Sequence, residues 1–146
     1  CGACGHCSNE HDVDIQAQTA STLTSDSRVC AFRILWGGSA VVDRCLDRAI
    51  GFTEPCRNCW TENIQCTYQH CKFTCLKTMY LLGDKDTNEE DGTLNPCLQC
   101  DEKMCGPSFL ECSGSNRRRL GIVSDIERDS THEQCTGLDI DWNLFG

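Results

Sequence analysis

Cysteine is the residue type with most of the chemical potential in this chain, because 15 of the 146 residues are cysteines. Two segments repeat one cysteine pattern. Residues 55–71 read PCRNCWTENIQCTYQHC, and residues 96–112 read PCLQCDEKMCGPSFLEC. Both begin with Pro-Cys-x-x-Cys, and in both a fourth cysteine follows fifteen positions after the first. We interpret residues 55–75 and 96–112 as an internal repeat.

Three kinds of chemistry use cysteines at this spacing. They can form structural disulfides, two Cys-x-x-Cys motifs can bind one zinc ion, or a single motif at a helix start can act as a redox-active dithiol. The zinc alternative would use Cys56, Cys59, Cys97 and Cys100. A thioredoxin-like dithiol needs one motif after a β-strand, whereas this motif is repeated and follows no clear strand. The high cysteine content favours disulfides.

The disulfide interpretation assigns most cysteines to a framework that stabilises a chain with few large apolar residues. The predicted framework consists of Cys30, Cys45, Cys56, Cys59, Cys66, Cys71, Cys75, Cys97, Cys100, Cys105, Cys112 and Cys135. We expect at least six disulfides within the chain. The odd total leaves one cysteine free or bonded to another chain.

A separate cluster lies at the N-terminus, where Cys1, Cys4 and Cys7 are evenly spaced and His6 and His11 are nearby. Such spacing suits zinc or iron–sulfur ligation, although no fourth cysteine and proline follow Cys7. We favour an extended arm held by disulfides over a metal site.

The other polar residues form no recognisable catalytic group. His70 adjoins Cys71 on a predicted helix, but Cys71 is expected to be bridged. The sequence has no nucleophile elbow, phosphate-binding glycine loop or zinc-protease motif. Asp84 and Asp86 match the start of an EF-hand loop, but Glu89 stands where the loop needs glycine and Asn95 where it needs glutamate. We therefore expect no enzymatic activity, no catalytic residue and no cofactor, with zinc as the alternative.

Apolar spacing predicts a mainly α-helical domain. Ser39 is the expected N-cap of a helix that ends near Ile50. Thr61 is the expected N-cap of a second, longer helix. In that longer helix Ile64, Tyr68, Cys71, Cys75, Met79 and Leu82 recur every three or four residues. Cys71 and Cys75 cannot easily bond each other across a helical turn, so each should bond a neighbouring element. This predicts a cross-linked helical hairpin.

The second segment should form two short helices, because Gly106-Pro107 interrupts it and Gly114 ends it. The predicted architecture is a small disulfide-rich helical domain with extended, loop-rich arms at both ends. Residues 1–28 form a cysteine-containing arm and a Ser/Thr-rich linker, residues 29–135 the helical core, and residues 136–146 an apolar docking tail.

Charge and hydropathy limit the partners. The net charge of −9 argues against nucleic acid and anionic membranes, and no apolar run is long enough for a membrane span. Expected partner-docking residues are the basic cluster Arg117, Arg118 and Arg119, and Trp142 and Phe145 in the tail. The tail should dock either back on the domain or on a partner. We expect other protein subunits, or copies of the same chain, as partners.

The cysteine content predicts an oxidising compartment, either extracellular or an organelle lumen. Because the sequence begins at Cys1 without a methionine, we expect that a leader peptide has been removed. Within residues 55–127, CWTENIQCTYQHCKFTCLK and PCLQCDEKMCGPSFLECSGSNRRRLGIVSDI resemble uncharacterised cysteine-rich proteins of diatom-type algae and their relatives. The resemblance implies an exported or lumenal protein without an established catalytic role.

The sequence thus predicts a non-enzymatic structural or docking subunit of a larger assembly. If the source is photosynthetic, an accessory lumenal subunit of a photosystem–antenna supercomplex is one concrete form, and an extracellular filament component is another. The alternative is a zinc- or redox-active Cys-x-x-Cys protein.

Overall fold

The structure, a computed structural model, describes residues 5–81 and 94–114. Within these ranges it contains six helices: α1 (Glu10–Gln18), α2 (Leu23–Phe32), α3 (Ile34–Ala49), α4 (Glu54–Leu81), α5 (Pro96–Met104) and α6 (Gly106–Ser113). It also contains six disulfides within the same ranges. The predicted small, disulfide-rich helical domain and the predicted minimum of six disulfides are both confirmed.

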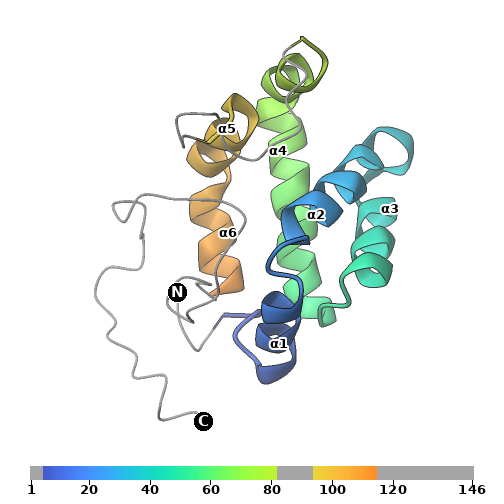
Figure 1. The fold of residues 1–146 in the computed structure, drawn as a ribbon, viewed down its shortest axis with the longest axis vertical. Helices are drawn as coiled ribbons and strands as arrows, with labels where there is room; N and C mark the ends of the chain where they lie inside the picture. The colour runs from blue at the N-terminus through green and yellow to red at the C-terminus, as the bar shows by residue number, and fades with distance from the viewer. Residues whose placement is uncertain (1–4, 82–93, 115–146) are drawn as a thin grey trace.

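The long helix α4 lies at the centre of the domain (Figure 1). α5 and α6 lie along one side of it, with α5 beside its upper half and α6 beside its lower half in this view. α2 and α3 form a hairpin on another side, and α1 lies near the lower end of α4. The lower half of α4 is therefore covered by more of the described elements than its upper half.

α4 begins earlier than the sequence predicts. Thr61, the expected N-cap, is buried inside a helix of 28 residues that already runs from Glu54. The first turn forms because the N–H of Arg57 donates to the carbonyl of Thr53, and because Pro55 has a φ suited to that turn. The first cysteine segment and the helix expected after it are one continuous element.

Two helices, α1 and α2, lie where the sequence predicts an extended arm and linker, so that prediction is corrected for residues 10–18 and 23–28. The side-chain oxygen of Asn9 caps α1 by accepting from the N–H of Asp12. Leu23 and Cys30 bury one side of α2. Neither α1 nor α2 has a pronounced apolar face in its sequence. Contacts with the rest of the domain therefore stabilise these two helices more than the spacing of their own apolar residues does.

The apolar stretch from Val29 to Trp36 forms the end of α2 and the start of α3. α3 is kinked at Gly38, whose φ of 65° lies in the left-handed region that favours glycine. The helix expected to begin at Ser39 is the part of α3 that follows this kink.

The break between α5 and α6 confirms the prediction for the second cysteine segment. Asn95 caps α5 by accepting from the N–H of Leu98, and Pro96 is the first residue of the helix. Cys105 separates the two helices, and Gly114, with φ of 66°, ends α6.

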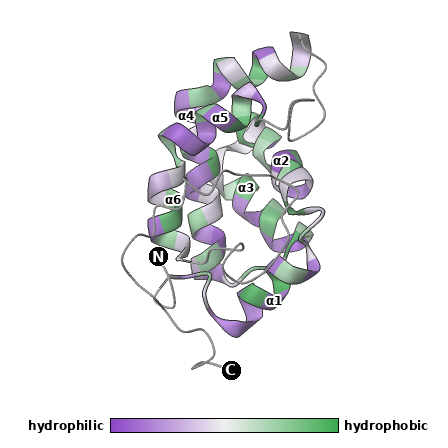
Figure 2. Ribbon diagram, turned by 60° about the vertical axis from the view of Figure 1, so that its left-hand side comes forward, coloured by the Kyte–Doolittle hydropathy of each residue, from purple (hydrophilic) through white to green (hydrophobic). Residues whose placement is uncertain are grey.

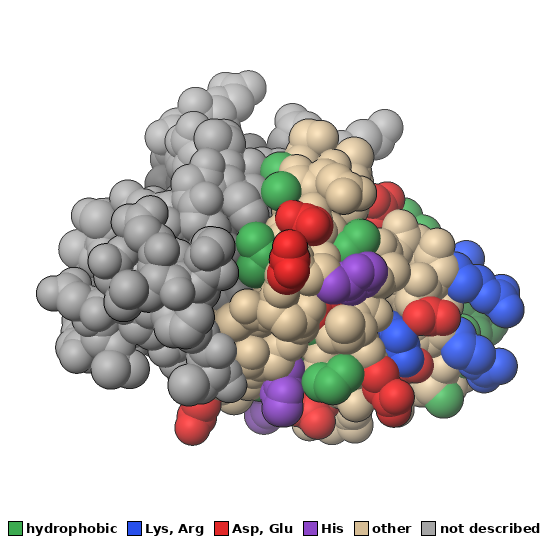
Figure 3. Space-filling model, turned by 90° about the horizontal axis from the view of Figure 1, so that it is seen from below, with side chains coloured by type: hydrophobic (Ala, Val, Ile, Leu, Met, Phe, Trp, Pro, Cys, Tyr) green, Lys and Arg blue, Asp and Glu red, His purple; other side chains and the backbone are tan. Residues whose placement is uncertain are grey.

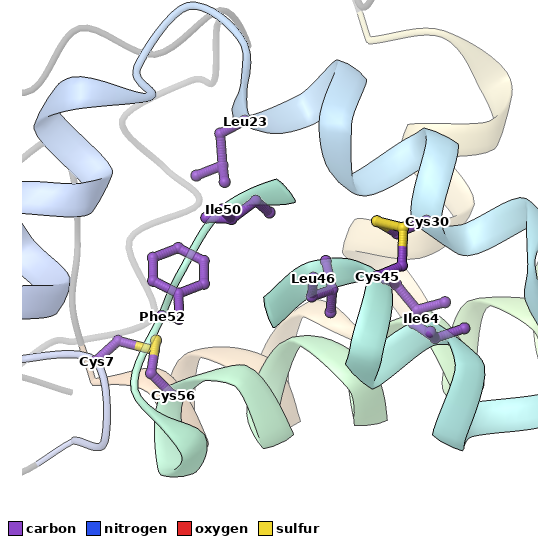
Figure 4. Packing of buried hydrophobic residues seen from close by; sticks show 10 residues of the cluster. Cys7, Leu23, Cys30, Cys45, Leu46, Ile50, Phe52, Cys56 and Ile64 are labelled. Atoms are coloured by element: carbon purple, nitrogen blue, oxygen red, sulfur yellow. A yellow bond between two sulfur atoms is a disulfide. The ribbon is translucent and has the colours of Figure 1, made fainter. Parts of the chain in front are cut away.

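The hydrophobic core lies between α2, α3 and the lower half of α4 (Figure 4). Its buried members are Cys7, Leu23, Cys30, Val42, Cys45, Leu46, Ile50, Phe52, Cys56 and Ile64. Four of these ten are disulfide-bonded cysteines. Trp60 continues the core towards α6, because it stacks on Phe52 at 5.7 Å and meets Phe109 edge-on at 4.9 Å between ring centroids.

One buried carboxylate joins α1 to the start of α4. Asp12 is fully buried, and it accepts the N–H of Thr53 at 2.7 Å and the Thr53 hydroxyl at 2.5 Å. The amide of Asn9 also donates to it, at 2.5 Å. The carboxylate thus lies at the N-terminal end of α4, where the helix dipole favours negative charge.

We expect Asp12→Ala to lower the free energy of unfolding by about 1–2 kcal/mol, because it leaves the half-buried N–H and hydroxyl of Thr53 without this acceptor. The measurement is urea unfolding with the disulfides intact. Asp14→Ala is the matched control, because it removes the same charge from an exposed position of α1 and should cost less than about 0.5 kcal/mol. Equal losses for both variants would contradict the assignment.

Candidate functional site

Four disulfides join α4 to α5 and α6, and they form the main candidate site. The pairs are Cys75–Cys97, Cys71–Cys100, Cys66–Cys105 and Cys59–Cys112. The pairing is nested, so the last cysteine of α4 bonds the first of α5. On α4 these cysteines are separated by four, five and seven residues from the top downwards, and on the opposite side by three, five and seven. The two spacings match only when the segments run antiparallel.

The two Pro-Cys-x-x-Cys motifs consequently have different environments. In the first motif, Cys56 bonds Cys7 and Cys59 bonds Cys112, at the lower end of the domain. The cysteines of the second motif bond the upper half of α4 instead. The predicted repeat is present in the sequence, but its two copies do not occupy equivalent positions along the hairpin.

This arrangement separates the four sulfurs of the zinc alternative. Cys100 bonds Cys71, which lies twelve residues beyond Cys59 on the same helix. At 1.5 Å per residue the two α4 positions are about 18 Å apart. A zinc ion binds sulfur at about 2.3 Å, so one ion cannot reach Cys56, Cys59, Cys97 and Cys100 together. No group of three or more potential metal-binding side chains occurs among the described residues.

The redox alternative meets a similar obstacle. In a thioredoxin-like site the two cysteines of one Cys-x-x-Cys motif bond each other when oxidised. Here the cysteines of both motifs bond other elements. Cys56 and Cys59 of the first motif are buried, and so is Cys105, which lies outside both motifs. The geometry favours disulfides that hold elements together.

Most of the predicted framework is confirmed. Eleven of its twelve cysteines are disulfide-bonded, and the twelfth, Cys135, lies outside the described residues. Cys30–Cys45 joins α2 to α3. The expectation that a disulfide holds the N-terminal segment is confirmed at Cys7, which bonds Cys56. Cys1 and Cys4 also lie outside the described residues.

The N-terminal segment closes the lower end of the hairpin. The N–H groups of His6 and Cys7 donate to the carbonyls of Cys112 and Ser113 at 3.0 and 2.8 Å. These carbonyls belong to the last turn of α6, which has no partners for them within the helix. Gly5 lies so close to Ser113 and Gly114 that no Cβ would fit there. No pattern in the sequence predicts this contact.

Polar contacts accompany the disulfides between α4 and α5. Asp101 of α5 accepts from the amide of Asn63 at 3.2 Å and closely from the hydroxyl of Thr67. On the opposite side, Arg57 of α4 bonds Asp43 at 2.8 Å and Asp47 at 2.7 Å on α3. The hydrogen bond with Asp43 raises the pKa of Arg57 above its ordinary value, while burial opposes the rise. These groups join α4 to α5 and to α3.

Every cysteine among residues 5–81 and 94–114 is disulfide-bonded, so none of them forms a nucleophile pair with a histidine. His70 is exposed beside the bridged Cys71, and the Nε2 of His11 lies 2.9 Å from the carbonyl of Gly51. The predicted docking residues Arg117, Arg118, Arg119, Trp142 and Phe145 lie outside the described residues. The structure therefore leaves their role as a prediction.

Two exposed apolar surfaces were missed by the sequence analysis. One, the α2–α3 tip, consists of Val29, Leu35 and Trp36, and Trp36 is 88% exposed. The other lies on the upper half of α4. It consists of Phe73, Leu76 and Tyr80, and their spacing of three and four residues is the sequence signal that could have indicated it. Along the described helices as a whole, hydrophilic and hydrophobic residues are mixed (Figure 2). By contrast, the lower end of the domain shows only scattered apolar side chains among charged and polar ones (Figure 3).

Comparison with known proteins gives one match. A model for a family of unknown function (DUF8771) matches residues 39–137, which include α4, α5, α6 and most of α3. No curated protein matches the chain, and no solved structure does. Among the described helices, none combines the length and hydrophobicity that crossing a membrane requires.

The nested pairing can be checked by peptide mapping of the unreduced protein. We expect linked peptides for Cys59–Cys112, Cys66–Cys105, Cys71–Cys100 and Cys75–Cys97, because only antiparallel helices match these spacings. The mapping should be done at acidic pH, which suppresses thiolate formation and hence disulfide exchange. Links between equivalent positions of the two repeats, such as Cys59 with Cys100, would show a parallel arrangement and overturn the hairpin.

Proposed function

We propose that this chain, which belongs to the family of unknown function matched over residues 39–137, is a non-enzymatic structural subunit that docks in a larger assembly. The observation that carries the proposal is the use of cysteine. Eight cysteines fix one helical hairpin at four successive levels. Such cross-linking restricts the motion of the hairpin, which suits a spacer or scaffold between partners.

The same observation weakens the alternative. A zinc site needs free thiolates that converge, and a redox site needs a dithiol that opens and closes. In this chain the cysteines of both Pro-Cys-x-x-Cys motifs are bonded to other elements. Either activity would require the hairpin to come apart.

The disulfides indicate an oxidising compartment. We place the protein more narrowly outside the cell or in an organelle lumen, with the thylakoid lumen of an alga as one case, on the basis of the resemblance of residues 55–127 to algal cysteine-rich proteins. An accessory subunit of a photosystem–antenna supercomplex and a filament component both fit a rigid, acidic, disulfide-bonded domain. Neither needs chemistry from this chain.

Partner contact is proposed for the α2–α3 tip and for Arg117–Arg119. Trp36 is a large aromatic residue that projects into solvent beside Leu35, and such residues often dominate binding energy at interfaces. The arginine cluster can bind carboxylates of a partner in a bidentate manner. Together they offer an apolar and a cationic contact on an acidic protein.

A structural role predicts that the disulfides resist cellular reductants. When the protein is incubated in a glutathione buffer with a redox potential of about −200 mV, all six described disulfides should stay closed. The reason is that structural disulfides have reduction potentials below about −300 mV. Alkylation followed by mass spectrometry measures this. The control is the same protein in denaturant at the same potential, where the folded state no longer protects them. The opposite result would be the opening, in the folded protein, of a disulfide that contains a cysteine of a Pro-Cys-x-x-Cys motif. If the protein also catalysed the reduction of insulin, the redox alternative would be favoured.

Docking predicts a complex of defined stoichiometry in native mass spectra of the protein isolated from its source. Trp36→Ser should weaken that complex by about thirtyfold, the effect of losing one dominant interface residue. Arg44→Ser, an exposed change elsewhere on α3, is the control and should have little effect. A chain that is always monomeric, or that carries one zinc per molecule by elemental analysis, would contradict the proposal.

A further inference from the structure

The upper half of α4 carries an exposed apolar face that the described fold does not use. Phe73, Leu76 and Tyr80 are 78%, 37% and 78% exposed. They are three and four residues apart, so they lie on one side of the helix, and we call them the α4 stripe. Cys71, Cys75 and Thr78 lie on other sides, where the two cysteines bond α5 and Thr78 is buried. The disulfides therefore fix the stripe in an outward-facing position.

Positive charge flanks the α4 stripe. Lys72 and Lys77 lie next to it, and from Asn63 to Tyr80 the helix contains no acidic residue. The ammonium of Lys72 lies 5.3 Å from the ring centroids of both Tyr68 and Phe73. In a chain of net charge −9, this surface is suited to an apolar segment with negative charge.

The C-terminal segment of the same chain has that chemistry. Residues 138–145 read LDIDWNLF, in which five apolar residues accompany two aspartates. A second copy of the α4 stripe is a poorer partner, because it would bring lysines towards lysines. The alternation of apolar and acidic residues in the tail suits an extended segment, with its apolar side chains on one side.

The length of the intervening chain allows the contact within one molecule. Cys112, near the end of α6, bonds Cys59, and α4 runs about 21–32 Å from there to Phe73 and Tyr80. The 23 residues 115–137 would span about 24–29 Å on average as a flexible chain. Such a connection gives an effective concentration in the millimolar range, far above that of other copies in dilute solution.

We propose that residues 138–145 dock on the α4 stripe of their own chain. The inference does not rest on the structural function proposed above. It decides between the two expectations for the tail, docking on the domain or on a partner, in favour of the domain. It leaves the α2–α3 tip as the apolar surface open to other subunits.

The test is limited chymotrypsin digestion of the full-length oxidised protein, which measures the rate of cleavage after Trp142. Each rate is divided by that of a free peptide with the same tail sequence, so that changes in the cleavage site itself cancel. The double variant F73S/Y80S should raise the normalised rate about tenfold, because cleavage requires an undocked tail. Trp36→Ser is the matched control, an exposed aromatic away from α4, and should leave the rate unchanged.

A charge exchange makes the test specific. K72E/K77E should also release the tail, and adding D139K/D141K to that variant should restore protection, because the complementary charges are then present with reversed sign. Release by F73S/Y80S without any effect of the charge variants would overturn the assignment of the acidic tail residues. Circular dichroism checks that each variant remains helical.

The concentration dependence separates the possible occupants. Docking within one chain predicts a monomer in light scattering and a normalised rate that is constant from about 1 to about 100 µM. Protection that increases with concentration would mean that the tail of a second copy occupies the stripe, and would overturn the proposal. A wild-type rate equal to that of the free peptide, or release by Trp36→Ser alone, would also overturn it.

Discussion

The antiparallel disulfide pairing of α4 with α5 and α6 is the constraint on which the rest of the structure depends. The four bridges have sequence separations of 22, 29, 39 and 53 residues, so each outer bridge closes only a short additional loop. Closing a loop of about 15 residues stabilises a fold by about 3 kcal/mol in the chain-entropy model. The bridges therefore act at successive levels, and together they hold α5 and α6 against α4 with few large apolar side chains between them.

The two halves of α4 are stabilised differently. Its lower half belongs to a buried core, in which Ile64, Phe52 and the Trp60–Phe109 contact remove apolar surface from water. Its upper half depends on the covalent bonds Cys71–Cys100 and Cys75–Cys97 to α5. Because burial is not needed to keep the upper half in place, one of its faces can remain apolar and exposed. This exposed face is a consequence of the disulfides.

The use of cysteines in disulfides also limits what chemistry the protein can perform. A cysteine that bonds a neighbouring helix is not available as a metal ligand or a nucleophile, and every cysteine among the described residues is disulfide-bonded. The disulfide-bonded domain instead holds two exposed apolar surfaces, the α2–α3 tip and the α4 stripe, in fixed positions relative to each other. A rigid acidic body with a few apolar contact points is suited to a position between other proteins, which is why a structural role is the more economical interpretation of its chemistry.

The sequence by itself determined the helical class, the disulfide density and the local breaks, because these depend on nearby residues. Cys71 and Cys75 at helical spacing, Gly106-Pro107 and Gly114 each specify a local geometry, and the structure confirms them. The partners of the cysteines, the helices in residues 10–32 and the contact of Gly5 with α6 depend on residues far apart in the chain. Pairing is a matter of distance in space, and many pairings are compatible with one order of cysteines. Only the tertiary structure, by aligning α4 antiparallel to α5 and α6, decided that two similar motifs bond at opposite ends of one hairpin.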